Sequence, residues 1–258
     1  MVPMPHVLER TIVIHARPDV VFGFFTDSAR WALWWGEGST VDPRPGGKLH
    51  IRYPNAIEAS GEVVEIESPS RIVFTFGFVS GQPMPPGASR VTITLTAVSQ
   101  GTRLQLTHHF ADAAACEMHV QGWRYQLALF TNVVADRVHS GAAERIDAWF
   151  GLWAQSDAAV RDAQLRILAA ADVQFRDRFS CVAGREDLAP HIAASQRFMP
   201  GITLARTGAV RHMQGMVLAQ WQANRPDGVV VGTGIHAFEF DADTRIVRVT
   251  GFWSVPGV

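Results

Sequence analysis

The residues of this chain that are best arranged for a chemical role are aromatic. Trp31, Trp34 and Trp35 lie close together in the stretch WALWWGEG. Their i, i+3 and i+4 spacing places the three indoles on one face if the segment is helical. Such a face can be ordinary core, the wall of a cavity for a flat apolar ligand, or a docking surface for another protein. The sequence leaves these three interpretations open.

Few titratable residues are placed for catalysis in the first half of the chain. In the segment GTRLQLTHHF, strand alternation puts His108 on the same face as Leu104 and Leu106, so that His108 points inward and His109 outward. An inward histidine is either a hydrogen-bonded core residue or an acid–base group. The first half contains no HExxH motif, carboxylate pair or nucleophile elbow. These observations favour a binding domain.

Composition narrows the classes of function. With 47% hydrophobic and 18% charged residues in 258, the chain predicts packed cores and two domains of ordinary size. The net charge is -1 and there is no run of like charge, so we expect neither nucleic acid nor a membrane as a partner. The N-terminus lacks a signal-peptide pattern and no segment is long and apolar enough to span a bilayer. We therefore expect a cytoplasmic protein.

Metal and cofactor sites are not indicated. Cys116 and Cys181 lack any CxxC spacing and are too few for a disulfide framework. His191, His212 and His236 lie on separate predicted elements, with no ligand spacing among them. We expect no bound metal and no cofactor.

The N-terminal elements form a predicted α+β domain over residues 1–139. A strand LERTIVIHA and a helix beginning at Pro18 precede the tryptophans, and five short strands follow up to about residue 109. The apolar period then changes to about 3.6 from Ala113 to Val138, which predicts one long amphipathic helix. We expect that helix to lie across the concave side of the sheet.

The C-terminal elements follow a different order over residues 140–258. Two helices are predicted, with Ser156 or Asp157 as the intervening N-cap. A strand DVQFRDRFS, a helix after Gly184 and four further strands complete the α+β domain. The halves share no repeat, so the chain is interpreted as a fusion of two domains.

The ordered N-terminal segments resemble a known family. WALWW, PGGKLHI, GEVVEIESPSRIVFTF, SRVTITLTAVSQGTRLQLTHHF and GWRYQLALF, over residues 6–138, are similar to the bacterial branch of the heat-shock-protein-90 ATPase activator (Aha) family, within the START-related SRPBCC superfamily. The resemblance implies a helix-grip fold, in which a curved antiparallel sheet surrounds a long C-terminal helix and encloses a cavity. We predict that this cavity is lined by Trp31, Trp34, Trp35, Phe76, His108, Trp123, Leu127 and Phe130.

The C-terminal segments resemble the nuclear transport factor 2-like (SnoaL-like) superfamily over residues 142–254. The matching segments are DVQFRDRF, VAGREDLAPHI, GTGIHAFEFDADTRIVRV and GFW. The resemblance implies a cone-shaped α+β barrel with an apolar pocket and a homodimer through its sheet. On the ketosteroid isomerase pattern, Asp177 falls at the general-base position and His236 at an oxyanion-hole position. Trp149 replaces the oxyanion tyrosine, which argues against steroid-type isomerisation.

This implied pair is chemically coherent. A carboxylate in an apolar pocket can remove a proton next to a carbonyl, and a histidine opposite can donate a hydrogen bond to the resulting enolate. The alternative is structural: Asp177 pairs with a nearby arginine, and His236 is a core donor. The predicted apolar walls are Trp149, Trp153, Phe198 and Trp221.

The predicted function is binding of a small hydrophobic molecule. Cofactor-independent proton transfer in the second domain, of the isomerase, cyclase or lyase type on a carbonyl compound, is the enzymatic form of this hypothesis. The alternative is a non-enzymatic interaction protein linked to a chaperone or to stress, which would have filled interiors and an exposed aromatic patch.

Overall fold

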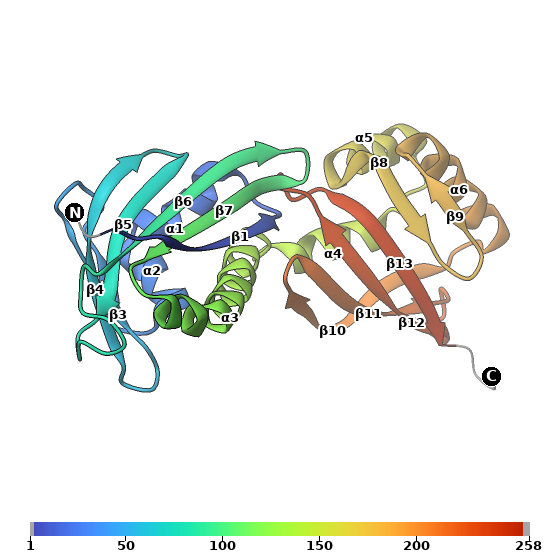
Figure 1. Cartoon of the computed structure of the whole chain (residues 1–258). Helices are drawn as coiled ribbons and strands as arrows, with labels where there is room; N and C mark the ends of the chain where they lie inside the picture. The colour runs from blue at the N-terminus through green and yellow to red at the C-terminus, as the bar shows by residue number, and fades with distance from the viewer. Residues whose placement is uncertain (1–2, 255–258) are drawn as a thin grey trace. The chain divides into compact units, whose positions relative to one another are not determined.

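The protein is described by a computed structural model over residues 3–254, and it divides into two compact units, Met1–Ala135 and Asp136–Val258. Each unit combines helices with one mainly antiparallel sheet, so the fold class is α+β (Figure 1). The division falls within the last turn of the long helix α3 (Ala113–Val138), a few residues before the boundary predicted after residue 139.

The first unit is built on an antiparallel sheet with the strand order β1-β7-β6-β5-β4-β3-β2. Side-chain alternation decides which face is covered: Val91, Ile93 and Leu95 are buried, whereas the threonines between them are half exposed. The strands are β1 (His6–Ile14), β2 (Thr40–Val41), β3 (Lys48–Arg52), β4 (Glu58–Glu67), β5 (Arg71–Phe78), β6 (Ser89–Val98) and β7 (Gly101–Phe110).

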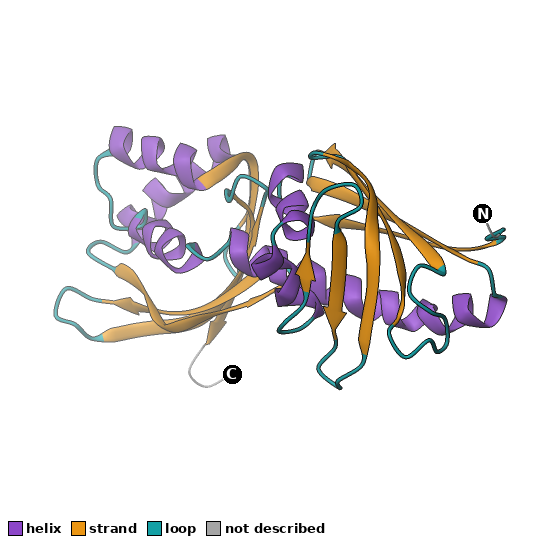
Figure 2. Cartoon of the chain, turned by 90° about the vertical axis from the view of Figure 1, so that its left-hand side faces the viewer, coloured by secondary structure: helices purple, strands orange, loops and turns teal. Residues whose placement is uncertain are grey.

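Three helices cover this sheet. Helix α1 (Pro18–Thr26) begins with a proline, and α2 (Ser28–Trp35) is capped by the Asp27 carboxylate, which accepts from the Arg30 N–H at 2.8 Å. The long helix α3 buries Phe130, whose ring lies 5.0 Å from that of Phe25 on α1. Figure 2 shows the long helix running alongside the strands of its unit. The arrangement is a helix-grip fold.

The second unit has an open sheet with the order β10-β11-β12-β13-β8-β9. Strands β13 and β8 pair in parallel and the other neighbours are antiparallel. No pairing joins β10 to β9 within residues 136–254, so the cone expected from the sequence is not a closed barrel. The elements are α4 (Ala142–Gly151), α5 (Ala158–Leu168), β8 (Ala169–Arg176), β9 (Cys181–Ala183), α6 (Arg185–Phe198), β10 (Thr203–Met213), β11 (Met216–Asn224), β12 (Val230–Phe240) and β13 (Ile246–Ser254).

Candidate functional site

The three clustered tryptophans lie on one face of α2 and are all buried. Trp31 Nε1 donates to the His50 carbonyl at 3.3 Å, and Trp34 Nε1 donates to the Phe24 carbonyl at 3.3 Å. Both indoles are therefore satisfied within the core. Trp35 differs, because its Nε1 has no hydrogen-bond partner among the described residues and its ring lines a cavity.

His108 belongs to a buried hydrogen-bond chain. Trp123 Nε1 donates to His108 Nδ1 at 2.9 Å, so the ring proton sits on Nε2, which donates to Ser89 Oγ at 2.8 Å. The Ser89 hydroxyl in turn donates to the Phe76 carbonyl at 2.9 Å. Burial, reinforced by two neighbouring histidines, holds the pKa of His108 well below its ordinary value. His108 is thus a neutral, fully hydrogen-bonded residue of the core.

The first unit contains a cavity of about 290 Å³. Of the residues predicted to line it, Trp35, Phe76 and Trp123 do so, whereas Trp31, Trp34, His108, Leu127 and Phe130 are buried and do not. The other lining residues are Tyr53, Asn55, Ile57, Phe78, Pro83, Met118, His119, Gly122, Tyr125 and Gln126.

Four polar residues of this lining, Tyr53, Asn55, His119 and Gln126, were not predicted, and the pKa values of two of them are shifted. Burial raises the pKa of Tyr53, so its phenol stays protonated and able to donate. His119 Nδ1 donates to the Ala115 carbonyl at 2.7 Å, and burial lowers the pKa of His119 despite that bond. His119 precedes Trp123 by one helical turn, so the i, i+4 rule could have identified it. Tyr53 follows a short strand and carried no such signal.

Asp177 begins the turn that follows β8. One carboxylate oxygen, Oδ1, accepts from the Phe179 N–H and from the Ser180 hydroxyl, each at 2.8 Å. The other oxygen, Oδ2, accepts from the Trp253 indole N–H at 3.2 Å. No salt bridge joins this carboxylate to an arginine within residues 3–254. The turn and β13 therefore fix its orientation without a counter-charge.

Asp177 lines one cavity of the second unit, with a volume of about 550 Å³. Trp153 and Phe198 line it as well, as the sequence analysis expected. Its polar wall includes His191, whose Nε2 lies 3.1 Å from Ser180 Oγ. The remaining lining residues are Phe179, Ser180, Ala194, Ser195, Gln196, Met199, Ile202, Leu204 and Trp253.

His236 lies near Asp177, although it does not line the cavity. A side chain added at Gly251 would lie 2.7 Å from His236 Nε2 and 3.1 Å from the Asp177 Cβ, so these two residues flank the same backbone position. Burial lowers the pKa of His236 to about 4, with Asp177 opposing that shift. The ring is therefore neutral at pH 7.

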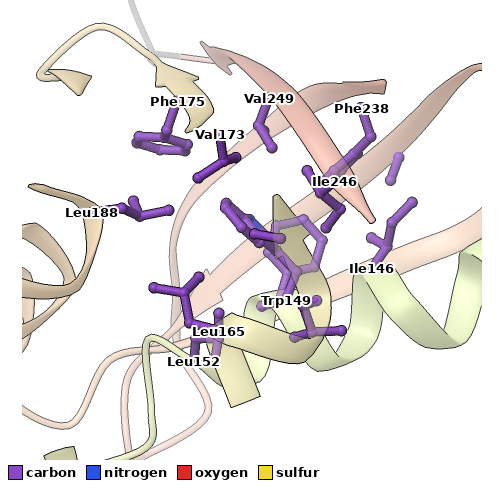
Figure 3. Packing of buried hydrophobic residues seen from close by; sticks show 14 of the residues in the cluster. Ile146, Trp149, Leu152, Leu165, Val173, Phe175, Leu188, Phe238, Ile246 and Val249 are labelled. Atoms are coloured by element: carbon purple, nitrogen blue, oxygen red, sulfur yellow. The ribbon is translucent and has the colours of Figure 1, made fainter. Parts of the chain in front are cut away.

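The ring of His236 packs against Phe175 and Phe238, which belong to a core of aromatic and aliphatic side chains. Figure 3 shows Phe175 and Phe238 among the aliphatic side chains of that core. Trp149 and Trp221 are fully buried in it, and the Trp221 ring centre lies 5.4 Å from that of His236. Among the described residues, the indole nitrogens of both tryptophans and His236 Nδ1 have no hydrogen-bond partner. The structure thus buries these three predicted site residues together in the core and leaves Asp177, Trp153 and Phe198 on the cavity wall.

Over residues 3–254, no group of three or more His, Cys, Asp or Glu side chains is arranged to hold a metal ion. In the same residues, no helix combines the length and the apolar character that crossing a bilayer requires.

Comparison with known proteins identifies the first unit. The family model described as "Activator of Hsp90 ATPase homolog 1-like protein" matches residues 15–135. The solution structure of an AHSA1-like protein from Rhizobium etli is 33% identical, covers 51% of this chain and 84% of its own, and has a TM-score of 0.42. No curated protein matches the chain.

A second similarity concerns the SnoaL-like family. A protein from Agrobacterium tumefaciens named as a SnoaL-like isomerase is 20% identical, covers 43% of this chain and 96% of its own, and has a TM-score of 0.42. A third similar structure, of a protein from Chromobacterium violaceum whose name gives no family, is 25% identical, covers 49% of this chain and 96% of its own, and has a TM-score of 0.41.

The family model and the Rhizobium etli relative both match the first unit. Through residues 15–135, the chain belongs to the Activator of Hsp90 ATPase homolog 1-like family.

Proposed function

We propose that the second unit binds a small hydrophobic carbonyl compound in the cavity beside Asp177. The observation that carries this proposal is a half-buried carboxylate on the wall of a cavity of about 550 Å³ whose other walls are largely apolar. Ligand pockets of about 300–1,000 Å³ with a few fixed polar groups are typical of small-molecule sites. Trp153 and Trp253 provide flat surfaces on which such a ligand can stack.

The proposed chemistry is proton removal next to the carbonyl, with Asp177 as the base. Its carboxylate is held in one orientation by three donors, and an oriented base meets the substrate without a reorganisation cost. His236, the predicted hydrogen-bond donor, is buried and does not line the cavity, so no contact with the ligand is proposed for it. Burial lowers the pKa of His236 to about 4, so its neutral ring places no counter-charge beside Asp177 at pH 7.

Deuterium exchange tests this function directly. Cyclic and polycyclic ketones, incubated in D₂O with the whole chain, should acquire deuterium next to the carbonyl, as followed by NMR. Asp177→Asn should lower the exchange rate by about 100-fold or more, the usual contribution of a positioned base. Asp172→Asn removes an exposed carboxylate from β8, the strand that precedes Asp177, and should leave the rate unchanged. Equal rates in the wild-type protein and Asp177→Asn would refute the proposal.

The first unit supports a second candidate function, which is binding without catalysis. Its cavity is lined mainly by aromatic rings, and its neutral Tyr53 and unpaired Trp35 indole offer hydrogen bonds to an apolar ligand that carries one polar group. This assignment makes the first unit a sensor or carrier for a hydrophobic molecule.

Gly122 allows a clean test of that cavity. It lines the cavity on α3, and a Cβ added there meets no atom within 4 Å. Gly122→Leu should therefore fill the space without a clash and abolish ligand-induced stabilisation in thermal-shift measurements. Gly122→Ala, which improves the helix by about 1 kcal/mol and leaves most of the space open, should retain it. Equal ligand response in both variants would exclude this cavity as the binding site.

A further inference from the structure

The two oxygens of the Asp177 carboxylate are held unequally. Oδ1 accepts two hydrogen bonds at 2.8 Å, from a backbone N–H and from the Ser180 hydroxyl. Oδ2 accepts one longer bond, at 3.2 Å, from the Trp253 indole. Since each donor occupies a lone pair, Oδ2 retains more capacity to accept a proton.

The Asp177 carboxylate decides the direction of the Ser180 hydroxyl and, through it, which nitrogen of His191 carries the hydrogen. Ser180 carries a single proton and lies within hydrogen-bond distance of both the Asp177 carboxylate and His191 Nε2. An ionised carboxylate can only accept, so the hydroxyl proton goes to Asp177, and His191 Nε2 must carry the hydrogen that donates to Ser180 Oγ. The chain of donors runs from His191 through Ser180 to Asp177.

This direction also argues against a nucleophilic serine. A nucleophilic hydroxyl gives its proton to a neighbouring base, as in a Ser–His pair. Here the histidine nitrogen is the donor, and the hydroxyl proton is committed to a carboxylate at the shorter distance, 2.8 Å against 3.1 Å. Ser180 is therefore suited to holding Asp177 in place.

Separate elements hold His191 and Ser180. His191 lies on α6, with its ring 5.7 Å from that of Phe175 on β8. Ser180 closes the turn after β8, since the Asp177 N–H donates to its carbonyl at 3.0 Å. Packing of α6 against β8 thus sets the distance between histidine and serine.

We propose that Ser180 and His191 are positioning residues that fix the Asp177 carboxylate with Oδ2 as its proton-accepting oxygen. A catalytic role for this arrangement rests on the function proposed above, in which Asp177 removes a proton next to a carbonyl. It adds His191, a residue outside the predicted catalytic pair, to the site of proton transfer.

The Trp253 indole provides a readout that needs no substrate. Its N–H contacts Oδ2, so its ¹H–¹⁵N resonance, assigned with Trp253→Phe, reports the position of the carboxylate. Ser180→Ala and His191→Leu should shift this resonance. His191→Gln retains an N–H donor near the same place and should leave it close to the wild-type position. Ser195→Ala removes a hydroxyl from the same cavity without contacting Asp177 and serves as the control.

Turnover of an exchanging ketone provides the second readout. His191→Leu should lower kcat on the order of tenfold or more with little change in KM, because misorientation affects the transition state more than binding. His191→Gln should restore most of kcat. A Gln variant as slow as the Leu variant would show that His191 itself exchanges protons, and would overturn the positioning role.

The two proposals fail in distinguishable ways. If the Trp253 resonance is unchanged in both Ser180→Ala and His191→Leu, the positioning proposal is wrong, whatever the activity. If the resonance moves as expected and the wild-type protein exchanges no ketone, the fixed orientation stands and the proposed proton transfer is wrong.

Discussion

At the scale of single residues, the buried histidines His108 and His236 differ in the hydrogen-bond partners of their ring nitrogens. Both have pKa values lowered mainly by desolvation. His108 has a protein partner at each ring nitrogen, whereas His236 Nδ1 has none among the residues that the structure describes. An unpaired buried polar atom costs about 1–3 kcal/mol. The unpaired Nδ1 of His236 therefore lowers the stability of the folded state, as often occurs beside a functional group.

The lowered pKa of His236 predicts a loss of stability in acid. In the unfolded chain this histidine takes up a proton below about pH 6.5, while the folded ring stays neutral until about pH 4. The unfolded state then binds more protons, so the free energy of unfolding falls as the pH drops through that window, by on the order of 3 kcal/mol. Urea denaturation of the wild-type protein and His236→Leu at several pH values measures this. The variant should show a smaller pH slope, and an identical slope would contradict the assignment.

The site was only partly predictable from sequence at this scale. The resemblance to the helix-grip family placed Trp35 and Trp123 on the same cavity, and their ring centres lie 5.8 Å apart. Ser180 follows Asp177 at the spacing of a side-chain-capped turn, which is a local signal. His191 carries no local signal, because its contact with Ser180 depends on how α6 packs on β8.

At the scale of elements, the ends of a helix could be predicted where a capping side chain or a regular apolar period marks them. The long apolar period predicted a helix from Ala113 to Val138, and α3 has those bounds. The parallel pairing of β13 with β8 was not predictable, because it joins segments that are distant in sequence, such as Val249 and Phe175. The short strands β2 and β9 were missed because two or three residues show no alternation.

The start of α5 yields an element-scale prediction. The sequence left Ser156 and Asp157 as alternative N-caps, and the structure selects Asp157, whose Oδ1 accepts from the N–H groups of Ala159 at 2.8 Å and Val160 at 3.1 Å. Asp157→Ala should lower the free energy of unfolding by about 1 kcal/mol, whereas Ser156→Ala should have little effect. Chemical denaturation of both variants measures the difference, and equal losses would contradict this assignment of the cap.

At the scale of the whole molecule, each unit has a hydrophobic core of its own. The core of the second unit is formed by residues between Ala142 and Val249, and all of these lie in that unit. The cavities follow the same division, since each is lined by residues of one unit. We therefore expect that a core substitution in one unit changes the stability of that unit alone.

Matched core truncations test this independence. Phe130 and Phe238 are both fully buried, one in each unit. Replacement of either by alanine should cost about 3–5 kcal/mol. In hydrogen-exchange mass spectrometry, Phe130→Ala should accelerate exchange in peptides before residue 135, and Phe238→Ala in peptides after it. Acceleration throughout the chain in both variants would instead indicate one cooperative unit.

The close packing of the α2 indoles has an optical consequence. With ring centres 4.3 Å apart for Trp34 and Trp35 and 5.1 Å apart for Trp31 and Trp34, absorbed light energy passes among the three rings before it is emitted. A molecule that quenches Trp35 from the cavity would also reduce the fluorescence of Trp31 and Trp34. The fluorescence of this unit would then respond to an occupant more strongly than a single tryptophan could, and the coupled transitions should give a paired signal in ultraviolet circular dichroism.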